Sequence, residues 1–158
     1  MIAHLSGVLL RKSQDEQRVI VDVGGLGYEV LLPAFVMRAL EDKREGEPID
    51  LEIYYHVSER QPRPTLIGFS RPHERAFFEK LIQVEDIGPI KAARALTLSI
   101  STIARAIEDD DVRTLRRLDG IGERTAHKIV ATLRGRVAAE ALLRDEGFVS
   151  AAPQSIKT

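Results

Sequence analysis

Apolar and polar residues alternate along the first part of the chain, which is the pattern of β-strands with one buried face. Such runs occur at 19–23, 28–32, 51–55 and 66–69. The first two flank Gly24-Gly25-Leu26-Gly27, a glycine cluster typical of a hairpin turn. About five short strands with one small helix over 34–40 predict a small β-barrel of the OB type over residues 1–69.

The pattern changes to helical spacing near Ser70, which we expect to cap a helix that starts at Pro72. Apolar residues then recur every three or four positions to about Arg136, with Ser101 or Thr102 as a further predicted cap. The chain is therefore predicted to be a multi-domain α+β protein, with an all-α domain over 70–136. Residues 137–158 are predicted to start as a short helix and to end as a flexible tail.

A repeat lies inside the helical part, because residues 87–96 can be aligned with 121–130 at an offset of 34 residues. Both copies begin with Ile-Gly between two helical segments, which is the layout of a helix-hairpin-helix. A glycine in such a turn permits close approach of a ligand and a positive φ. The next helix presents unpaired N–H groups and the positive end of its dipole, where a phosphate oxygen fits. Tandem hairpins therefore predict binding to the DNA backbone without reading its sequence.

The candidate phosphate contacts combine hairpin glycines, which offer backbone N–H groups, with nearby polar and basic side chains. They are Gly88, Lys91, Arg94, Arg116, Arg117, Gly120, Gly122, Arg124, Thr125 and Lys128. The first hairpin is expected to bind more weakly, because an acid, Asp86, stands where the second has Gly120, and Ile90 stands where the second has Arg124.

Charge changes this picture little. The whole chain has a net charge of −1, but residues 65–136 hold 13 Lys/Arg against 10 Asp/Glu. The chain contains no cysteine, no apolar run near the ~20 residues of a membrane span and no signal-peptide layout at its start, so we expect a cytoplasmic protein.

No enzyme chemistry is predicted. Gly24-Gly25-Leu26-Gly27 lacks a following Gly-Lys-Ser/Thr, so it favours a turn over a nucleotide site. The four histidines are scattered, and Asp109-Asp110-Asp111 is better explained as a helix start than as a metal site. We therefore expect no catalytic residue, no metal and no cofactor.

Several motifs together resemble the RuvA family. They are Val21–Val30 around the glycine turn, Gly68-Phe69, Glu74-Arg75, Ile87-Gly88-Pro89, Asp119-Gly120-Ile121-Gly122 and Thr125-Ala126. The resemblance runs in order from Met1 to about Arg136. It implies an OB-fold domain, tandem hairpins and a homotetramer, single or paired, that binds four-way (Holliday) junction DNA. In the family this tetramer is a scaffold for branch migration in homologous recombination and DNA repair, driven by a separate ATPase, RuvB.

Two departures from the family bear on mechanism. Family members carry acidic residues at the junction centre, in a loop that here contains Glu59, Arg60, Gln61 and Arg63. Gln61 and Pro62 match the acidic positions, so we expect this basic loop to attract the DNA crossover rather than repel it. The sequence also ends at Thr158, before the family's third domain, so it is either shortened or does not recruit RuvB in the usual way.

Two alternatives remain open. One is a duplex-binding module accessory to a nuclease or glycosylase, and the other is a structural oligomer whose hairpins bind nothing. A glycosylase itself is disfavoured, because residues 134–138 beyond the second hairpin contain no carboxylate.

Overall fold

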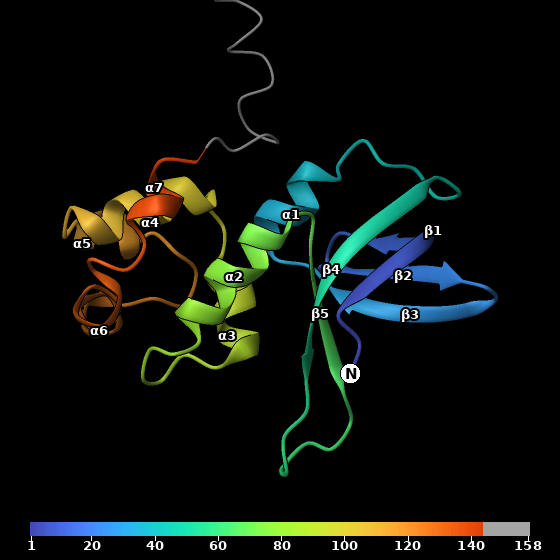
Figure 1. The fold of residues 1–158 in the computed structure, drawn as a ribbon, viewed down its shortest axis with the longest axis horizontal. Helices are drawn as coiled ribbons and strands as arrows, with labels where there is room; N and C mark the ends of the chain where they lie inside the picture. Colours follow the sequence, from blue (N-terminus) through green and yellow to red (C-terminus); the bar gives the residue numbers. More distant parts are fainter. Residues whose placement is uncertain (144–158) are drawn as a thin grey trace, which may run out of the picture.

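A computed structural model describes residues 1–143, in which a closed barrel of five strands is followed by a cluster of helices (Figure 1). The first 69 residues form β1 (His4–Ser13), β2 (Arg18–Val23), β3 (Leu26–Leu31), α1 (Ala34–Ala39), β4 (Pro48–His56) and β5 (Thr65–Phe69). The strand order is β1-β2-β3-β5-β4, and β4 pairs with β1 to close the barrel. This order confirms the predicted OB-type barrel.

The predicted hairpin joins β2 to β3 through Gly24 and Gly25, whose φ values are +60° and +94°. Both residues need the left-handed region that glycine adopts without strain, so the glycines make a turn. β1 is the strand that no predicted run marked. Only Leu5 and Leu9 of its apolar residues are buried, and the exposed Val8 and a bulge near Leu9 hide the alternation.

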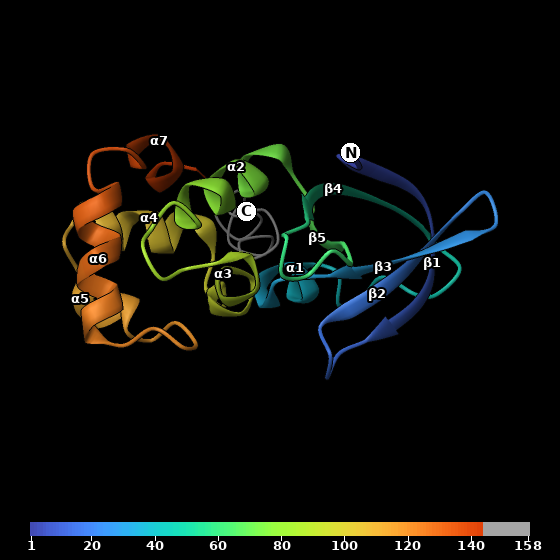
Figure 2. The ribbon, with the colours of Figure 1, turned by 90° about the horizontal axis from the view of Figure 1, so that it is seen from below.

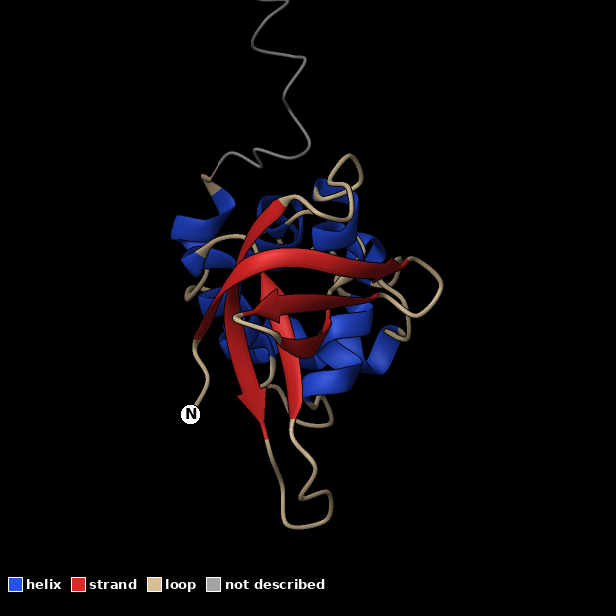
Figure 3. Ribbon diagram, turned by 90° about the vertical axis from the view of Figure 1, so that its right-hand side faces the viewer, coloured by secondary structure: helices blue, strands red, loops and turns tan. Residues whose placement is uncertain are grey.

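The remaining described chain is helical, as predicted. It forms α2 (Pro72–Leu81), α3 (Pro89–Ala95), α4 (Ile100–Glu108), α5 (Val112–Leu115), α6 (Glu123–Leu133) and α7 (Ala138–Ala141). Figure 2 shows these helices gathered beside one end of the barrel, and Figure 3 shows the barrel with the helices behind it.

Two predicted helix caps were wrong by one to three residues. Ser70 does not cap α2, because Arg71 is the N-cap residue and the Glu74 carboxylate accepts from the backbone N–H groups of Ser70 and Arg71, at 2.9 and 3.2 Å. Ser99 caps α4 in place of Ser101 or Thr102, and its hydroxyl accepts from the Thr102 N–H at 3.3 Å. The hydroxyl-rich run around Ser99 gave several candidates, and packing of the chain selected one.

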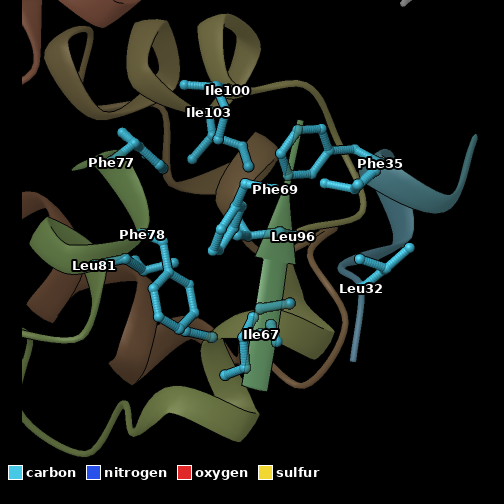
Figure 4. Close-up of a cluster of buried hydrophobic side chains, with 14 of the residues drawn as sticks. Leu32, Phe35, Ile67, Phe69, Phe77, Phe78, Leu81, Leu96, Ile100 and Ile103 are labelled. Carbon is cyan, nitrogen blue, oxygen red and sulfur yellow. The ribbon is translucent and has the colours of Figure 1, made fainter. Parts of the chain in front are cut away.

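The core runs without a break from the barrel into the helices. Figure 4 shows Phe69 of β5 among side chains from α2 and α4, with Leu32 and Phe35 beside it. The Phe69 and Phe78 rings lie 5.1 Å apart between centroids, and the Phe35 N–H donates to the Leu96 carbonyl at 3.2 Å. Shared burial of large aromatic surface therefore fixes the helical part against the barrel.

The end of the described chain packs onto this core. Val137 is fully buried and α7 contacts α4, while the Lys80 ammonium of α2 lies 2.5 Å from the nearly buried Glu140 carboxylate. The domain boundary at Arg136 stays a prediction, and the predicted tail from residue 144 lies outside the described residues. Within 1–143 no helix is both long and apolar enough to span a membrane.

Candidate nucleic-acid interface

The first hairpin is built by α2, a turn and α3. Val84 and Ile87 are buried beneath the turn, and the Ile87 N–H donates to the Val84 carbonyl at 3.1 Å. Gly88 is the N-cap residue of α3, with φ −89° and ψ 177°, and its carbonyl accepts from the Ala92 N–H at 2.9 Å. The isoleucine thus anchors the turn, while Gly88 is exposed at the start of the helix.

The second hairpin, built by α5 and α6, repeats this geometry. The Ile121 N–H donates to the Leu118 carbonyl at 3.1 Å, and the Gly122 carbonyl accepts from the Ala126 N–H at 2.9 Å. Gly122 caps α6 with φ −90° and ψ −176°. The structure therefore shows that the 34-residue repeat is a repeat of backbone conformation, with Ile87 and Ile121 both buried.

The positive φ of each turn lies two residues before the cap. Gly120 has φ +77°, and Asp86, at the matching position, has φ +72°. Aspartate is one of the few residues apart from glycine that adopts this region with moderate strain. The turn geometry thus survives the change from glycine to aspartate, and the chemistry of the two turns differs.

Gly88 and Gly122 are glycines that the protein itself does not require. Their φ values are open to any residue, and a Cβ on either would meet no protein atom within 4 Å. Neither glycine has a side chain that could cap its helix, so the first N–H groups of α6 have no intrahelical partner. The absence of side chains leaves room for an external group to approach these N–H groups closely.

The predicted contact residues that have side chains differ in their surroundings. The exposed ones are Arg94, Arg116, Arg117 and Arg124, and the half-buried ones are Lys91, Thr125 and Lys128. A guanidinium nitrogen of Arg116 lies 3.6 Å from a Glu123 carboxylate oxygen, and both side chains are largely exposed. Such a pair is weak in water and leaves Arg116 able to turn toward another anion.

Lys128 links the second hairpin to the first. Its ammonium lies 2.6 Å from an Asp86 carboxylate oxygen and 2.9 Å from a Glu85 carboxylate oxygen. The pKa of Asp86 is lowered by the hydrogen bond and charge of Lys128, and to a smaller extent by the charges of Arg124 and Lys91. The hydrogen bonds that Lys128 donates to Asp86 and Glu85 raise the pKa of Lys128. One carboxylate is therefore paired with one predicted phosphate contact and feels the positive charge of two others.

This cluster is the part of the site that sequence reasoning missed. The repeat alignment marked Asp86 as a departure from glycine, and it predicted weaker binding by the first hairpin alone. It did not place Asp86 and Glu85 beside Lys128 of the second hairpin. These residues are 42 and 43 positions from Lys128 and meet it only through the packing of α6 against α2.

The loop between β4 and β5 projects from the barrel at the lower edge of the molecule in Figure 1. Glu59, Arg60, Gln61 and Arg63 are all exposed. The tip is closed by the Gln61 N–H, which lies 3.2 Å from the Ser58 carbonyl and 3.1 Å from its hydroxyl. The loop therefore presents two arginines and one glutamate to solvent.

The acidic run at the end of α4 has a structural explanation. Asp111 is the N-cap residue of α5, and its carboxylate accepts from the Thr114 N–H at 3.1 Å and from the Thr114 hydroxyl at 2.6 Å. These two hydrogen bonds lower the pKa of Asp111. Among residues 1–143, no group of three or more His, Asp or Glu side chains is arranged to hold a metal ion.

Taken together, the barrel and the site define a class: a protein in which a closed five-stranded OB-type barrel carries a tandem helix-hairpin-helix unit. Two family models match the same two parts. Residues 1–63 match the RuvA N terminal domain, and residues 78–134 match the SAM-like Helix-hairpin-helix tandem.

Curated relatives match the sequence over most of its length. The chain is 51% identical to the Holliday junction branch migration complex subunit RuvA of Desulfosudis oleivorans over 137 residues, which cover 87% of this chain and 66% of the relative. It is 49% identical to the protein of the same name from Desulforapulum autotrophicum, over 92% of this chain and 67% of the relative. A third RuvA, from Oceanobacillus iheyensis, is 36% identical over 92% of this chain and 70% of the relative. The chain belongs to the RuvA family, and it spans about two thirds of the length of these relatives.

Proposed function

We propose that this protein binds four-way junction DNA through the phosphate backbone, as a non-catalytic subunit of a cytoplasmic branch migration complex. The observation that carries the proposal is the pair of hairpins with one backbone geometry, each with an open glycine at the start of its second helix. The printed names of its relatives, which are junction branch migration subunits, agree with this role.

The division of labour follows from the geometry. Backbone N–H groups at Gly122 receive a phosphate oxygen, and exposed Arg124 adds charge one residue into the first turn of α6. Gly88 and Lys91 make the corresponding but weaker contact, because Asp86 and Ile90 stand where the second hairpin has Gly120 and Arg124. Arg94, Arg116 and Arg117 supply supporting charge, and a homotetramer brings four such units to the four arms of the junction.

The β4–β5 loop completes this proposal. Its exposed Arg60 and Arg63 give it a net positive charge, so it attracts phosphates at the crossover and strengthens junction binding at the expense of strand separation. Replacing Arg60→Glu together with Arg63→Glu should weaken junction binding several-fold at low salt, and linear duplex binding less. Unchanged junction affinity would remove the loop from the proposal.

The test is a titration of a fluorescent four-way junction and of a linear duplex of the same sequence, at moderate salt and with magnesium. Tight junction binding that weakens steeply with salt supports the proposal. Equal binding to both DNAs would indicate a general duplex-binding module instead. The mass of the free protein, measured by light scattering, tests the tetramer, and a mixture with a RuvB-type ATPase tests recruitment of the motor.

A further inference from the structure

The cluster formed by Glu85, Asp86 and Lys128 connects the first hairpin turn to the DNA-facing helix of the second. The ammonium contacts both carboxylates, and Arg124 and Lys91 act on Asp86 from nearby. A carboxylate beside the turn of the first hairpin is thus already paired with a basic residue of the second. A DNA phosphate is the other anion that these basic side chains can bind.

Stability does not explain the arrangement. The side chains of Glu85 and Asp86 are 79% and 65% exposed, against 23% for Lys128, and ion pairs with such exposed partners stabilise a fold only weakly. Asp86 also holds a positive φ, where glycine would be free of strain, as Gly120 is in the second hairpin. The aspartate therefore imposes a local conformational cost for an interaction of little stabilising effect.

We propose that Glu85 and Asp86 compete with DNA phosphate for Lys128. In the free protein the two carboxylates hold the Lys128 ammonium, and Lys128 becomes available only when a DNA phosphate displaces them. The inference rests on the proposed function, and it makes the two carboxylates determinants of affinity and salt dependence. The protein therefore binds DNA less tightly than its number of basic residues suggests. A site with multiple closely placed phosphates, such as a junction, competes better than an isolated phosphate.

The acid-free variant, Glu85→Gln with Asp86→Asn, tests this in the full chain of 158 residues. Its matched control is Asp109→Asn with Asp110→Asn, which removes the same charge from the same helical region. The control also places asparagine at a positive φ, since Asp110 has φ +53°. Thermal unfolding followed by circular dichroism establishes that both variants fold.

Affinity for a fluorescent four-way junction is measured across a series of salt concentrations. The acid-free variant should bind about three- to tenfold tighter than the unmodified protein. Its plot of log affinity against log salt should steepen by up to about 0.9, because Glu85 and Asp86 no longer take up cations from solution when Lys128 moves to a phosphate. The control should gain less and keep the original slope. Adding Lys128→Gln to the acid-free variant should restore that slope.

The outcomes separate the two proposals. If the unmodified protein binds the junction and the acid-free variant gains no more than the control, the competitor role is wrong and the proposed function stands. If only the acid-free variant binds, the competitor role is supported and junction binding by the unmodified chain is overturned. If neither protein binds any DNA, both proposals fall.

Discussion

The two hairpins have the same backbone and different chemistry. Each has a buried isoleucine, an exposed cap glycine with φ near −90°, and a positive φ two residues earlier. In the first hairpin the positive φ belongs to Asp86 and the second position of the helix to Ile90. In the second hairpin these positions are Gly120 and Arg124.

The comparison teaches that different residues determine the turn and its affinity for an anion. Burial of one isoleucine and the hydrogen bonds at the cap are enough to form the turn, because both copies share them. The exposed positions around the cap are free to vary without loss of the fold. The first hairpin can therefore carry acids that change how the second meets DNA, while its own backbone stays the same.

The largest effect should come from placing a carboxylate at the cap of the second hairpin. Gly122→Asp should weaken junction binding about tenfold or more, because the charge repels phosphate at the start of α6. Gly88→Asp should weaken it by only about threefold, since the first hairpin contributes less. Both variants should unfold at the temperature of the unmodified protein or slightly above it, because aspartate is a good N-cap residue. Equal losses of affinity would contradict the difference between the hairpins.

Junction binding should strengthen when the first hairpin receives the basic residue that the second hairpin has at the matching position. Ile90 is 37% exposed, so Ile90→Arg removes little packing. Junction affinity should rise about threefold, and the salt dependence should steepen by about 0.9 per new phosphate contact. The measurement is the same salt-dependent titration, with Ile90→Gln as the uncharged control. If arginine and glutamine behave alike, the first hairpin does not approach the DNA.

Stability should distinguish the two glycines of the second turn. Gly120→Ala should lower the free energy of unfolding by about 1 kcal/mol, because alanine is strained at φ +77°. Gly122→Ala should lower it by less, about 0.5 kcal/mol, since its φ suits any residue and a Cβ meets open space, and only the poorer N-cap propensity of alanine remains. Urea denaturation measures both values. A loss at Gly122 as large as that at Gly120 would mean that the cap glycine has a structural role.

The smallest effect is a shift in acid titration. The pKa of Asp86 is lowered by Lys128, so this pairing stabilises the fold fully above the unfolded aspartate value of about 3.9. The contribution is lost as the pH falls through the lower folded pKa. In Lys128→Gln the titration midpoint of the Asp86 carboxyl, followed by NMR, should rise. An unchanged midpoint would show that the pair does not form in solution.

Much of the candidate site follows from local pattern. The Ile-Gly repeat and its flanking helical periodicity were sufficient to predict two hairpins, because hairpin formation depends on residues within one short segment. The exact helix caps were less predictable. Ser70, Ser99, Ser101 and Thr102 are all good cap residues, and the choice among such neighbours depends on where the chain leaves the core.

The sequence by itself determined the class of most segments, β1 excepted: strands where apolar residues alternate, helices where they recur every three or four positions, and turns where glycine supplies a positive φ. Tertiary structure alone decided how these segments meet. The closure of β3 on β5, the burial of Phe69 among the helices, and the contact of Lys128 with Asp86 and Glu85 join residues far apart in the chain. Such contacts arise from packing of whole faces, which no local pattern contains.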